Sequence, residues 1–149
     1  AFSITAYNEK EIFAQLNVYQ CAELELCYAP PFGAAKDLLN FAGMLAQNLQ
    51  EGLLTQIEPE EVNAWQQKGA LFIDVRDPLE VAKGGILGAI NIPLPTLRTR
   101  VDEIPRDKTL VVFCQVGLRA HTACRFLQQK GFSVRHLNGG FRSVEMLTA

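Results

Sequence analysis

The segment TLVVFC, at residues 109–114, is apolar almost throughout and rich in β-branched residues. Such a run predicts a strand buried on both faces, which is typical of a parallel sheet covered by helices. Three further short runs of this kind, at residues 70–75, 89–93 and 133–137, alternate with helix-like segments along the second part of the chain. Strands that alternate with helices predict a parallel sheet.

Helical patterns lie between these strands. Residues 59–68 begin with a proline and stop at Gly69, which is the usual asymmetry of helix ends. Two apolar stripes follow, one before Pro105 and one before Gly131, made by Leu94, Leu97, Val101 and Ile104 and by Ala120, Ala123, Cys124 and Leu127. We therefore expect residues 57–149 to form an α/β domain, an open parallel sheet with helices on both faces.

Residues 1–56 have a different character, and we place the boundary between the two parts near residues 52–57. The sequence YAPPFG predicts a rigid turn or extended piece, because its two prolines fix the backbone. An amphipathic helix is predicted over residues 34–50, with an apolar face formed by Leu38, Phe41, Ala42, Leu45 and Leu49. The segment is too small for a core of its own, so we expect this face to rest on the second part or on another chain.

The composition excludes several classes of protein. A formal net charge of −2 argues against a general nucleic-acid binder. No apolar run approaches the ~18 residues that a membrane span needs, and the first residues lack the pattern of a signal peptide. We therefore expect a cytoplasmic protein with free thiols. Its four cysteines, Cys21, Cys27, Cys114 and Cys124, show neither CxxC nor zinc-like spacing, so no metal site is predicted.

One cysteine stands where an open parallel sheet binds its ligands, at the carboxyl end of a strand. Cys114 ends the strand at 109–114, and the sequence CQVGLR turns from it into the next helix. Such a turn points backbone N–H groups inward, and the helix dipole adds about half a positive charge. Both stabilise a thiolate, the nucleophilic form of cysteine. Gly117 suits a tight backbone, and Arg119 can brace the loop through a carboxylate or help hold an anion.

From the residues alone, three interpretations of this loop stay open. It holds a sulfur atom, it holds a phosphate, or it only turns the chain. A lone cysteine is usually a buried small hydrophobe, and that is our interpretation of Cys124, which lies on an apolar stripe. Cys114 differs because strand, cysteine, glycine and arginine follow in the order that a reactive site requires. A disulfide between the two is the least favoured option, because ten residues of loop and helix separate them.

The sequence CQVGLR, together with FIDVRDPLE, GAINIP and LNGGF, resembles the rhodanese (sulfurtransferase) family from about residue 54 to residue 147. The resemblance implies a domain whose cysteine accepts a sulfane sulfur as a persulfide and passes it to a thiol acceptor. It implies that Cys114 is the nucleophile, and that Asp74 and Arg76 have a structural role first. The persulfide cradle then corresponds to the backbone of Gln115, Val116, Gly117, Leu118 and Arg119.

The length of the loop distinguishes a sulfurtransferase from a phosphatase or an arsenate reductase. Phosphatases and arsenate reductases that resemble this fold have one residue more between the cysteine and the arginine, which makes a wider ring for an oxyanion. The side chains of residues 115–118 are uncharged, so Arg119 is the only cation of the loop. We therefore expect modest activity with thiosulfate, and a low-molecular-weight or protein persulfide as the natural sulfur donor. A non-catalytic rhodanese-like binding module is the main alternative.

The first part of the chain resembles the end of the dimerisation domain of coenzyme A-disulfide reductases, which belong to the pyridine nucleotide-disulfide oxidoreductases. The resemblance lies in ELELCYAPPFGAAKDLLNFAGMLAQN, at residues 23–48. It implies a homodimer through residues 34–50 and places Tyr28 near a coenzyme A site, although Tyr28 as a packing residue is an equal alternative. No GxGxxG follows a strand, so the sequence predicts no FAD, NADH or other bound cofactor.

Overall fold

The computed structural model of the protein describes residues 16–25 and 36–148. The chain divides into two compact units, Ala1–Leu53 and Leu54–Ala149. Tyr28, Cys27 and the YAPP sequence lie outside the described residues, so the expectations about them stay predictions. Within the described ranges, no helix has the length and apolar character that crossing a membrane requires.

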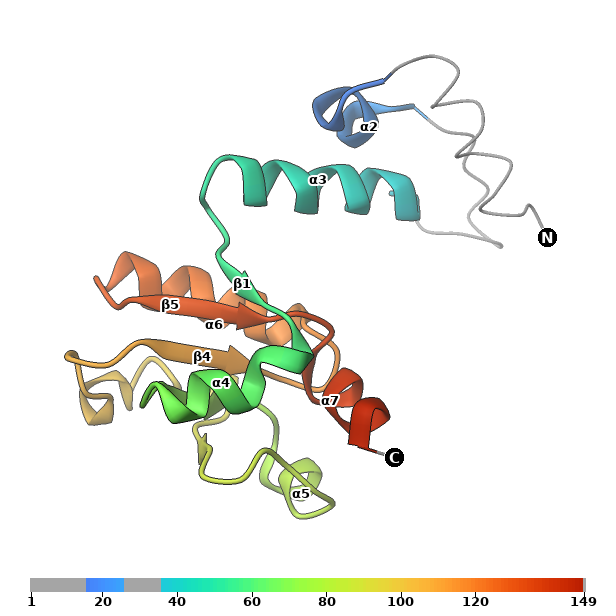
Figure 1. Ribbon diagram of the computed structural model, residues 1–149. Coiled ribbons are helices and arrows are strands. Elements are labelled where there is room, and N and C mark those ends of the chain that lie inside the picture. The colour runs from blue at the N-terminus through green and yellow to red at the C-terminus, as the bar shows by residue number, and fades with distance from the viewer. Residues whose placement is uncertain (1–15, 26–35, 149) are drawn as a thin grey trace. The chain divides into compact units, whose positions relative to one another are not determined.

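The second unit is built on a sheet of five strands, all parallel, in the order β1-β5-β4-β2-β3 (Figure 1). The strand predicted at 109–114 is β4, which lies at the centre of the sheet between β2 and β5. The short β1 was not predicted, because it forms only by pairing with β5. The strands are β1 Gln56–Ile57, β2 Leu71–Asp74, β3 Ile90–Asn91, β4 Leu110–Phe113 and β5 Val134–Leu137.

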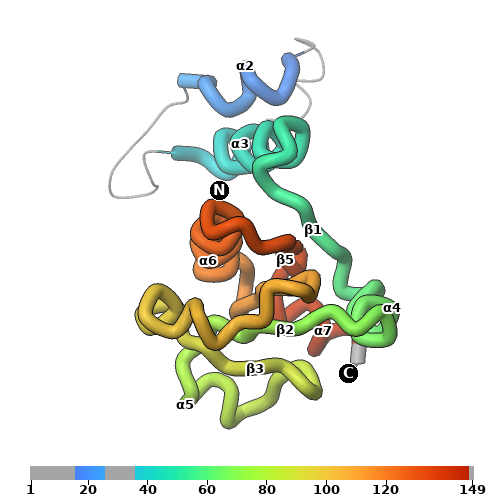
Figure 2. The backbone as a smooth tube through the Cα atoms, turned by 90° about the vertical axis from the view of Figure 1, so that its left-hand side faces the viewer, coloured from blue at the N-terminus to red at the C-terminus, as the bar shows by residue number. Residues whose placement is uncertain are grey.

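Helices cover both faces of this sheet, with α6 on one face and α4 and α7 on the other (Figure 2). The fold class predicted from the sequence is therefore confirmed. The last helix, α7, has no counterpart among the predicted helices. The helical elements up to β3 are η1 Pro59–Glu61, α4 Val62–Gln67 and α5 Pro78–Val81, and the later α-helices are α6 Leu118–Gln129 and α7 Gly140–Thr148.

The central strand supplies both hydrophobic cores, because successive side chains of a strand point to opposite faces. Leu110 and Val112 belong to the core beneath α6, whereas Val111 and Phe113 belong to the core beneath α4 and α7. All four side chains are completely buried. Burial of each side chain contributes about 1.5–3 kcal/mol to the folding stability. The strand that ends at Cys114 is therefore held rigidly from both sides.

One predicted helix is wrong. The apolar stripe before Pro105 forms two short 3₁₀ turns instead, η2 Leu94–Thr96 and η3 Val101–Glu103. The hydroxyls of Thr96 and Thr99 donate to the backbone carbonyl oxygens three residues earlier, which competes with α-helical bonding. Two of the four apolar side chains of the stripe, Leu97 and Ile104, nevertheless become buried beneath α6.

In the first unit, helices α2 (Val18–Glu23) and α3 (Leu38–Gln50) pack together. Gly43 permits this contact, because an added Cβ would lie 2.5 Å from the backbone nitrogen of Ala22. The amide of Asn40 donates to three carbonyl oxygens at the end of α2, those of Cys21, Ala22 and Leu24. The predicted apolar face of α3 points elsewhere, and its large side chains are 37% to 67% exposed.

Candidate active site

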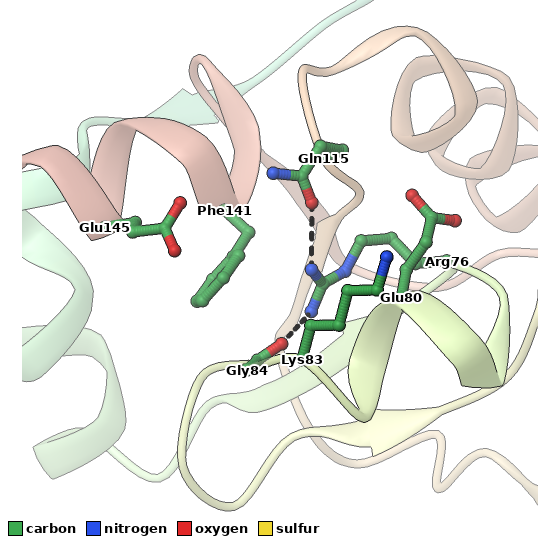
Figure 3. Close-up of a pocket in the computed structure, with 7 residues that line it drawn as sticks. All are labelled: Arg76, Glu80, Lys83, Gly84, Gln115, Phe141 and Glu145. Atoms are coloured by element: carbon green, nitrogen blue, oxygen red, sulfur yellow. Dashed lines mark hydrogen bonds between the residues drawn. The ribbon is translucent and has the colours of Figure 1, made fainter.

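Strands β2 and β4 end at the same edge of the sheet, and the side chain of Arg76 connects the segments that follow them. Its guanidinium donates to both carboxylate oxygens of Asp74, at 2.7 to 3.0 Å, and each side chain of this pair is only 2% exposed. It also donates to Gln115 Oε1 at 2.9 Å and to the carbonyl oxygen of Gly84 at 2.8 Å (Figure 3). Arg76 therefore joins three segments, as expected of a structural residue.

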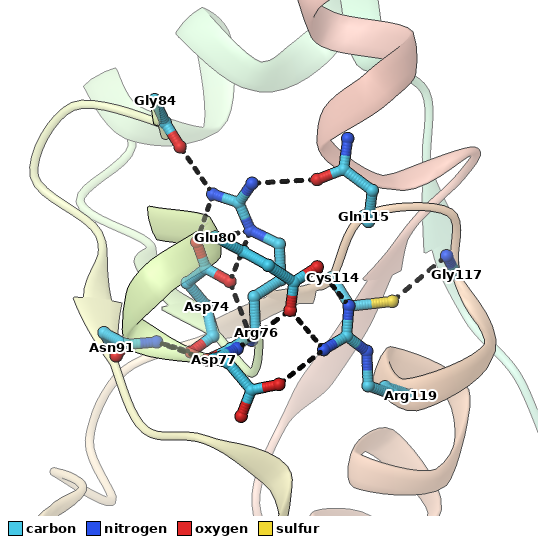
Figure 4. Close-up of polar contacts among 10 residues, drawn as sticks. All are labelled: Asp74, Arg76, Asp77, Glu80, Gly84, Asn91, Cys114, Gln115, Gly117 and Arg119. Carbon is cyan, nitrogen blue, oxygen red and sulfur yellow. Dashed lines mark hydrogen bonds and ion pairs between the residues drawn. The ribbon is translucent and has the colours of Figure 1, made fainter. Parts of the chain in front are cut away.

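Cys114 follows β4 directly, and its side chain is turned into the loop that leads to α6. The N–H of Gly117 donates to Cys114 Sγ at 3.2 Å (Figure 4). Gly117 has a φ of 115°, a conformation that side chains disfavour, and α6 begins at the next residue, Leu118. The sulfur thus receives a backbone donor at the positive end of a twelve-residue helix. Both features stabilise negative charge on a sulfur atom at this position.

The backbone of this 114–119 loop is fixed by the start of α7. The N–H groups of Phe141 and Arg142 donate to the carbonyl oxygens of Cys114 and Gln115, at 2.8 and 3.1 Å. A Cβ on Gly140 would lie 2.5 Å from the Cys114 carbonyl oxygen, so only glycine fits there. Gly140 of the LNGGF sequence thus allows α7 to approach the loop closely.

Arg119 is the one cation that the sequence places in the loop, and the structure pairs it with α5. Its two terminal nitrogens donate to the two carboxylate oxygens of Glu80 at 2.6 and 2.7 Å, and Asp77 lies 3.7 Å away. These bonds lower the pKa of Glu80 to about 2 and raise the pKa of Arg119. The sequence allowed two roles for Arg119, bracing the loop through a carboxylate or helping to hold an anion. The observed contact with Glu80 corresponds to the first role.

The remaining loop side chains point in different directions. Val116 and Leu118 are 59% and 77% exposed, so the loop presents two apolar side chains at the surface. The side chain of Gln115 is held by Arg76, and no described residue accepts from its amide nitrogen. The six predicted site residues thus lie together at the carboxyl end of β4, and the backbone N–H of Gly117 is the group that donates to the sulfur.

His136, on β5, is a site residue that the sequence analysis missed. Its Nε2 lies 3.1 Å from the carbonyl oxygen of Gly117, to which it donates, and its Nδ1 is buried without a partner among the described residues. Burial holds the pKa of His136 below its ordinary value, although the bond to Gly117 opposes this shift. The neutral histidine thus anchors the carbonyl side of Gly117, the residue whose own N–H faces Cys114. The only signal in the sequence was a histidine in the strand next to β4.

A cavity of about 320 Å³ adjoins the loop on the side of Gln115. Figure 3 shows Phe141 and Glu145 of α7 on one side of the Arg76 guanidinium, and Glu80 and Lys83 on the other. Sequence analysis did not single out its residues beyond those of the loop and Arg76, because they lie far apart in the chain. The complete lining is Arg76, Glu80, Lys83, Gly84, Gln115, Phe141 and Glu145.

Comparison with known proteins agrees with this geometry. Reduced Bacillus anthracis CoADR-RHD is 39% identical and has a TM-score of 0.92, covering 95% of this chain and 26% of its own. An NAD-dependent persulfide reductase from A. fulgidus is 37% identical with a TM-score of 0.80, covering 91% of this chain and 24% of its own. A curated sulfurtransferase of Allochromatium vinosum is 39% identical over 71 residues, which are 47% of this chain and 66% of the relative.

The two solved proteins are therefore much longer than this chain, which matches about a quarter of each. The model of the rhodanese-like domain family matches residues 58–146, from η1 to α7. Since that match takes in strands β2 to β5, the 114–119 loop and more than half of the chain, the protein belongs to the rhodanese-like domain family.

Proposed function

We propose that the protein is a sulfurtransferase that works through a persulfide on Cys114. The observation that carries the proposal is the bond from the Gly117 N–H to Cys114 Sγ at the start of α6. In the first step the Cys114 thiolate attacks the outer sulfur of a donor R–S–SH. A sulfur–sulfur bond to Cys114 forms, the bond within the donor breaks, and R–S⁻ leaves.

In the second step an acceptor thiolate attacks the outer sulfur of the Cys114 persulfide. The acceptor leaves as a new persulfide, and Cys114 is regenerated as a thiolate, so no external oxidant or reductant is needed. The backbone of Gln115, Val116, Gly117, Leu118 and Arg119 surrounds the outer sulfur in this proposal. Their inward N–H groups stabilise its charge in both steps.

Low-molecular-weight or protein persulfides are the proposed donors, in preference to thiosulfate. The guanidinium of Arg119 is already neutralised by Glu80, and the other loop side chains carry no charge. A small dianion gains little from such a loop. A higher specificity constant with thiosulfate than with glutathione persulfide or coenzyme A persulfide would contradict this preference.

Intact-mass measurement after incubation with each donor tests the proposed function. The wild-type protein is expected to gain one sulfur atom, which cyanide or a thiol then removes. Cys114→Ser is expected to gain none, whereas the matched control Cys124→Ser, in the same hydrophobic core, keeps the gain. If the wild-type protein gains no sulfur from any donor, the domain is a non-catalytic binding module instead. Turnover of a phosphate ester, or reduction of arsenate, would favour the phosphatase or arsenate reductase alternative that the short loop argues against.

For the first unit we propose a homodimer through residues 34–50, in a protein of the reducing cytoplasm. The proposal is supported by the exposed apolar side chains of α3, above all Leu38, Phe41 and Leu45. Residues 1–56 then represent the end of a pyridine nucleotide-disulfide oxidoreductase dimerisation domain. Light scattering of the whole chain should give the mass of a dimer, which Phe41→Glu reduces to that of a monomer. Gln50→Glu is the control, because Gln50 lies about two and a half turns from Phe41 and therefore on the opposite face of α3.

A further inference from the structure

His136 makes a polar contact with the 114–119 loop that packing alone does not require. It lies on the same face of β5 as Val134, which packs beneath α6, and only 7% of its surface is exposed. The other buried positions of β5 hold the apolar residues Val134 and Leu137. A histidine lowers the stability there, because its buried Nδ1 has no partner among the described residues. The contact with Gly117 therefore explains this residue better than packing does.

The oxygen that His136 contacts belongs to the first peptide of α6. The carbonyl oxygen of Gly117 accepts from His136 Nε2 at 3.1 Å and from the N–H of His121 at 2.8 Å, so both of its lone pairs are used. In a planar trans peptide the N–H lies opposite the carbonyl oxygen. Since this oxygen points along α6 towards His121, the N–H of Leu118 points out of the N-terminal end of the helix, towards the loop.

The N–H groups of Gly117 and Leu118 differ in their partners. The Gly117 N–H donates to Cys114 Sγ (Figure 4), whereas the Leu118 N–H has no acceptor among the described residues. The first N–H groups of a helix have no partner within it, and they bind negatively charged groups. A hydrogen bond to the carbonyl oxygen of a peptide polarises that peptide and strengthens its N–H as a donor. The bond from His136 therefore strengthens the Leu118 N–H and not the one already held by Cys114.

From these contacts we infer that His136 is a positioning residue of sulfur transfer, which acts through the Gly117–Leu118 peptide on the outer sulfur of the Cys114 persulfide. The Gly117 N–H holds Sγ, and the Leu118 N–H, oriented and polarised by His136, donates to the outer sulfur. The inference rests on the proposed sulfurtransferase function. In each step of that reaction one thiolate attacks the transferred sulfur and another leaves, so negative charge spreads over this sulfur in the transition state and the donor stabilises it.

This division of roles separates two reactions of Cys114. Sulfur transfer to and from Cys114 involves the outer sulfur, and therefore depends on His136. Alkylation by iodoacetamide involves Sγ alone, which the Gly117 N–H holds without help from His136. A histidine with only a structural role would change both reactions together. The rate constant of transfer, compared with that of alkylation in the same variant, therefore distinguishes a positioning role from a structural one.

The test uses glutathione persulfide as donor and 2-mercaptoethanol as acceptor, and follows both steps by intact mass. His136→Asn should lower both second-order rate constants on the order of fivefold, the effect of one hydrogen bond. The asparagine amide ends near the position of Nδ1 and does not reach the Gly117 carbonyl oxygen. His136→Gln should restore most of the rate, because its amide nitrogen reaches the position of Nε2 and donates there. Alkylation of Cys114 should proceed at the wild-type rate in both variants.

Two further variants complete the test. His136→Leu, which removes the donor and keeps an apolar side chain in the core, should show the same loss of transfer as His136→Asn. Val134→Ala is the matched control on the same face of β5, and it should lower the melting temperature and change neither reaction. Wild-type transfer rates in His136→Asn and His136→Leu, or an equal loss of transfer and alkylation, would overturn the inference. If the wild-type protein forms no persulfide, the sulfurtransferase proposal itself fails, which is a separate outcome.

Discussion

Cys114 and Cys124 lie ten residues apart and are equally buried, each with 1% of its surface exposed, in the same hydrophobic core. Their surroundings differ in kind. Cys124 stands within α6 among apolar side chains, and burial raises its thiol pKa to about 12. Cys114 stands at the end of a strand, where the Gly117 N–H points at its sulfur. The contrast shows that oriented backbone donors, and not exposure, distinguish the candidate nucleophile from a packing residue.

Alkylation gives the largest expected difference between the two thiols. With its pKa near 12, Cys124 is a thiolate in on the order of one molecule in 10⁵ at pH 7. We expect iodoacetamide to label Cys114 in the folded protein and to leave Cys124 unlabelled, as measured by peptide mass mapping over time. In urea both should be labelled. Labelling of Cys124 at a rate similar to that of Cys114 in the folded protein would remove the contrast.

Replacing Gly117 by alanine should slow the chemistry of Cys114 and leave Cys124 unaffected. A side chain at a φ of 115° costs about 1–3 kcal/mol, and its Cβ would lie 3.4 Å from the ring of His136. We expect the rate of persulfide formation, followed by intact mass, to fall on the order of tenfold as the N–H moves away from the sulfur.

Gly131→Ala is the matched control for that substitution. Gly131 also has a positive φ, 82°, but no atom lies within 4 Å of the position of an added Cβ. The control should therefore lower the stability, measured by thermal unfolding, and keep the wild-type rate of persulfide formation. If both alanine variants lost the rate equally, general destabilisation and not the Gly117 peptide would explain the loss.

The contrast between the cysteines was visible in the sequence for a physical reason. A strand apolar on both faces requires a buried central position, and the helix that follows β4 must begin near Cys114, whereas Cys124 falls on the apolar stripe of that helix. Both inferences use only neighbours in the chain. The sheet class and the loop could be predicted in this way, without knowledge of tertiary contacts.

The partners of the loop could not be predicted, because they come from distant segments. Arg119 lies 39 residues from Glu80, and Gly117 lies 19 residues from His136. Nothing in the local pattern distinguishes these residues from other surface or strand positions. The helix wrongly predicted before Pro105 has a related cause, since short 3₁₀ turns bury the same apolar residues that a regular helix would.

The pH dependence of the folding stability tests whether His136 is buried and neutral in the folded protein. Burial lowers its pKa in the folded state, so below about pH 6.5 the unfolded chain binds a proton that the folded protein does not. Stability should therefore fall as the pH falls from 7 towards 5. His136→Gln should lack this part of the slope, as measured by urea unfolding at several pH values. Equal slopes in both proteins would contradict the buried, neutral state of His136.

The smallest expected effect concerns Glu80, which holds Arg119 at the start of α6. Its lowered pKa means that the ion pair stabilises the protein above about pH 4.5 and that this stabilisation is lost as the pH falls towards 2. Because both side chains are about a third exposed, we expect about 1 kcal/mol or less. The melting temperatures of wild type and Glu80→Gln should differ at pH 7 and converge as the pH falls towards 2. Glu103→Gln, which breaks the exposed Arg100–Glu103 pair, is the control: it should leave persulfide formation unchanged, whereas Glu80→Gln slows it. An equal effect of both variants on that rate would mean that the brace on Arg119 does not position the loop around Cys114.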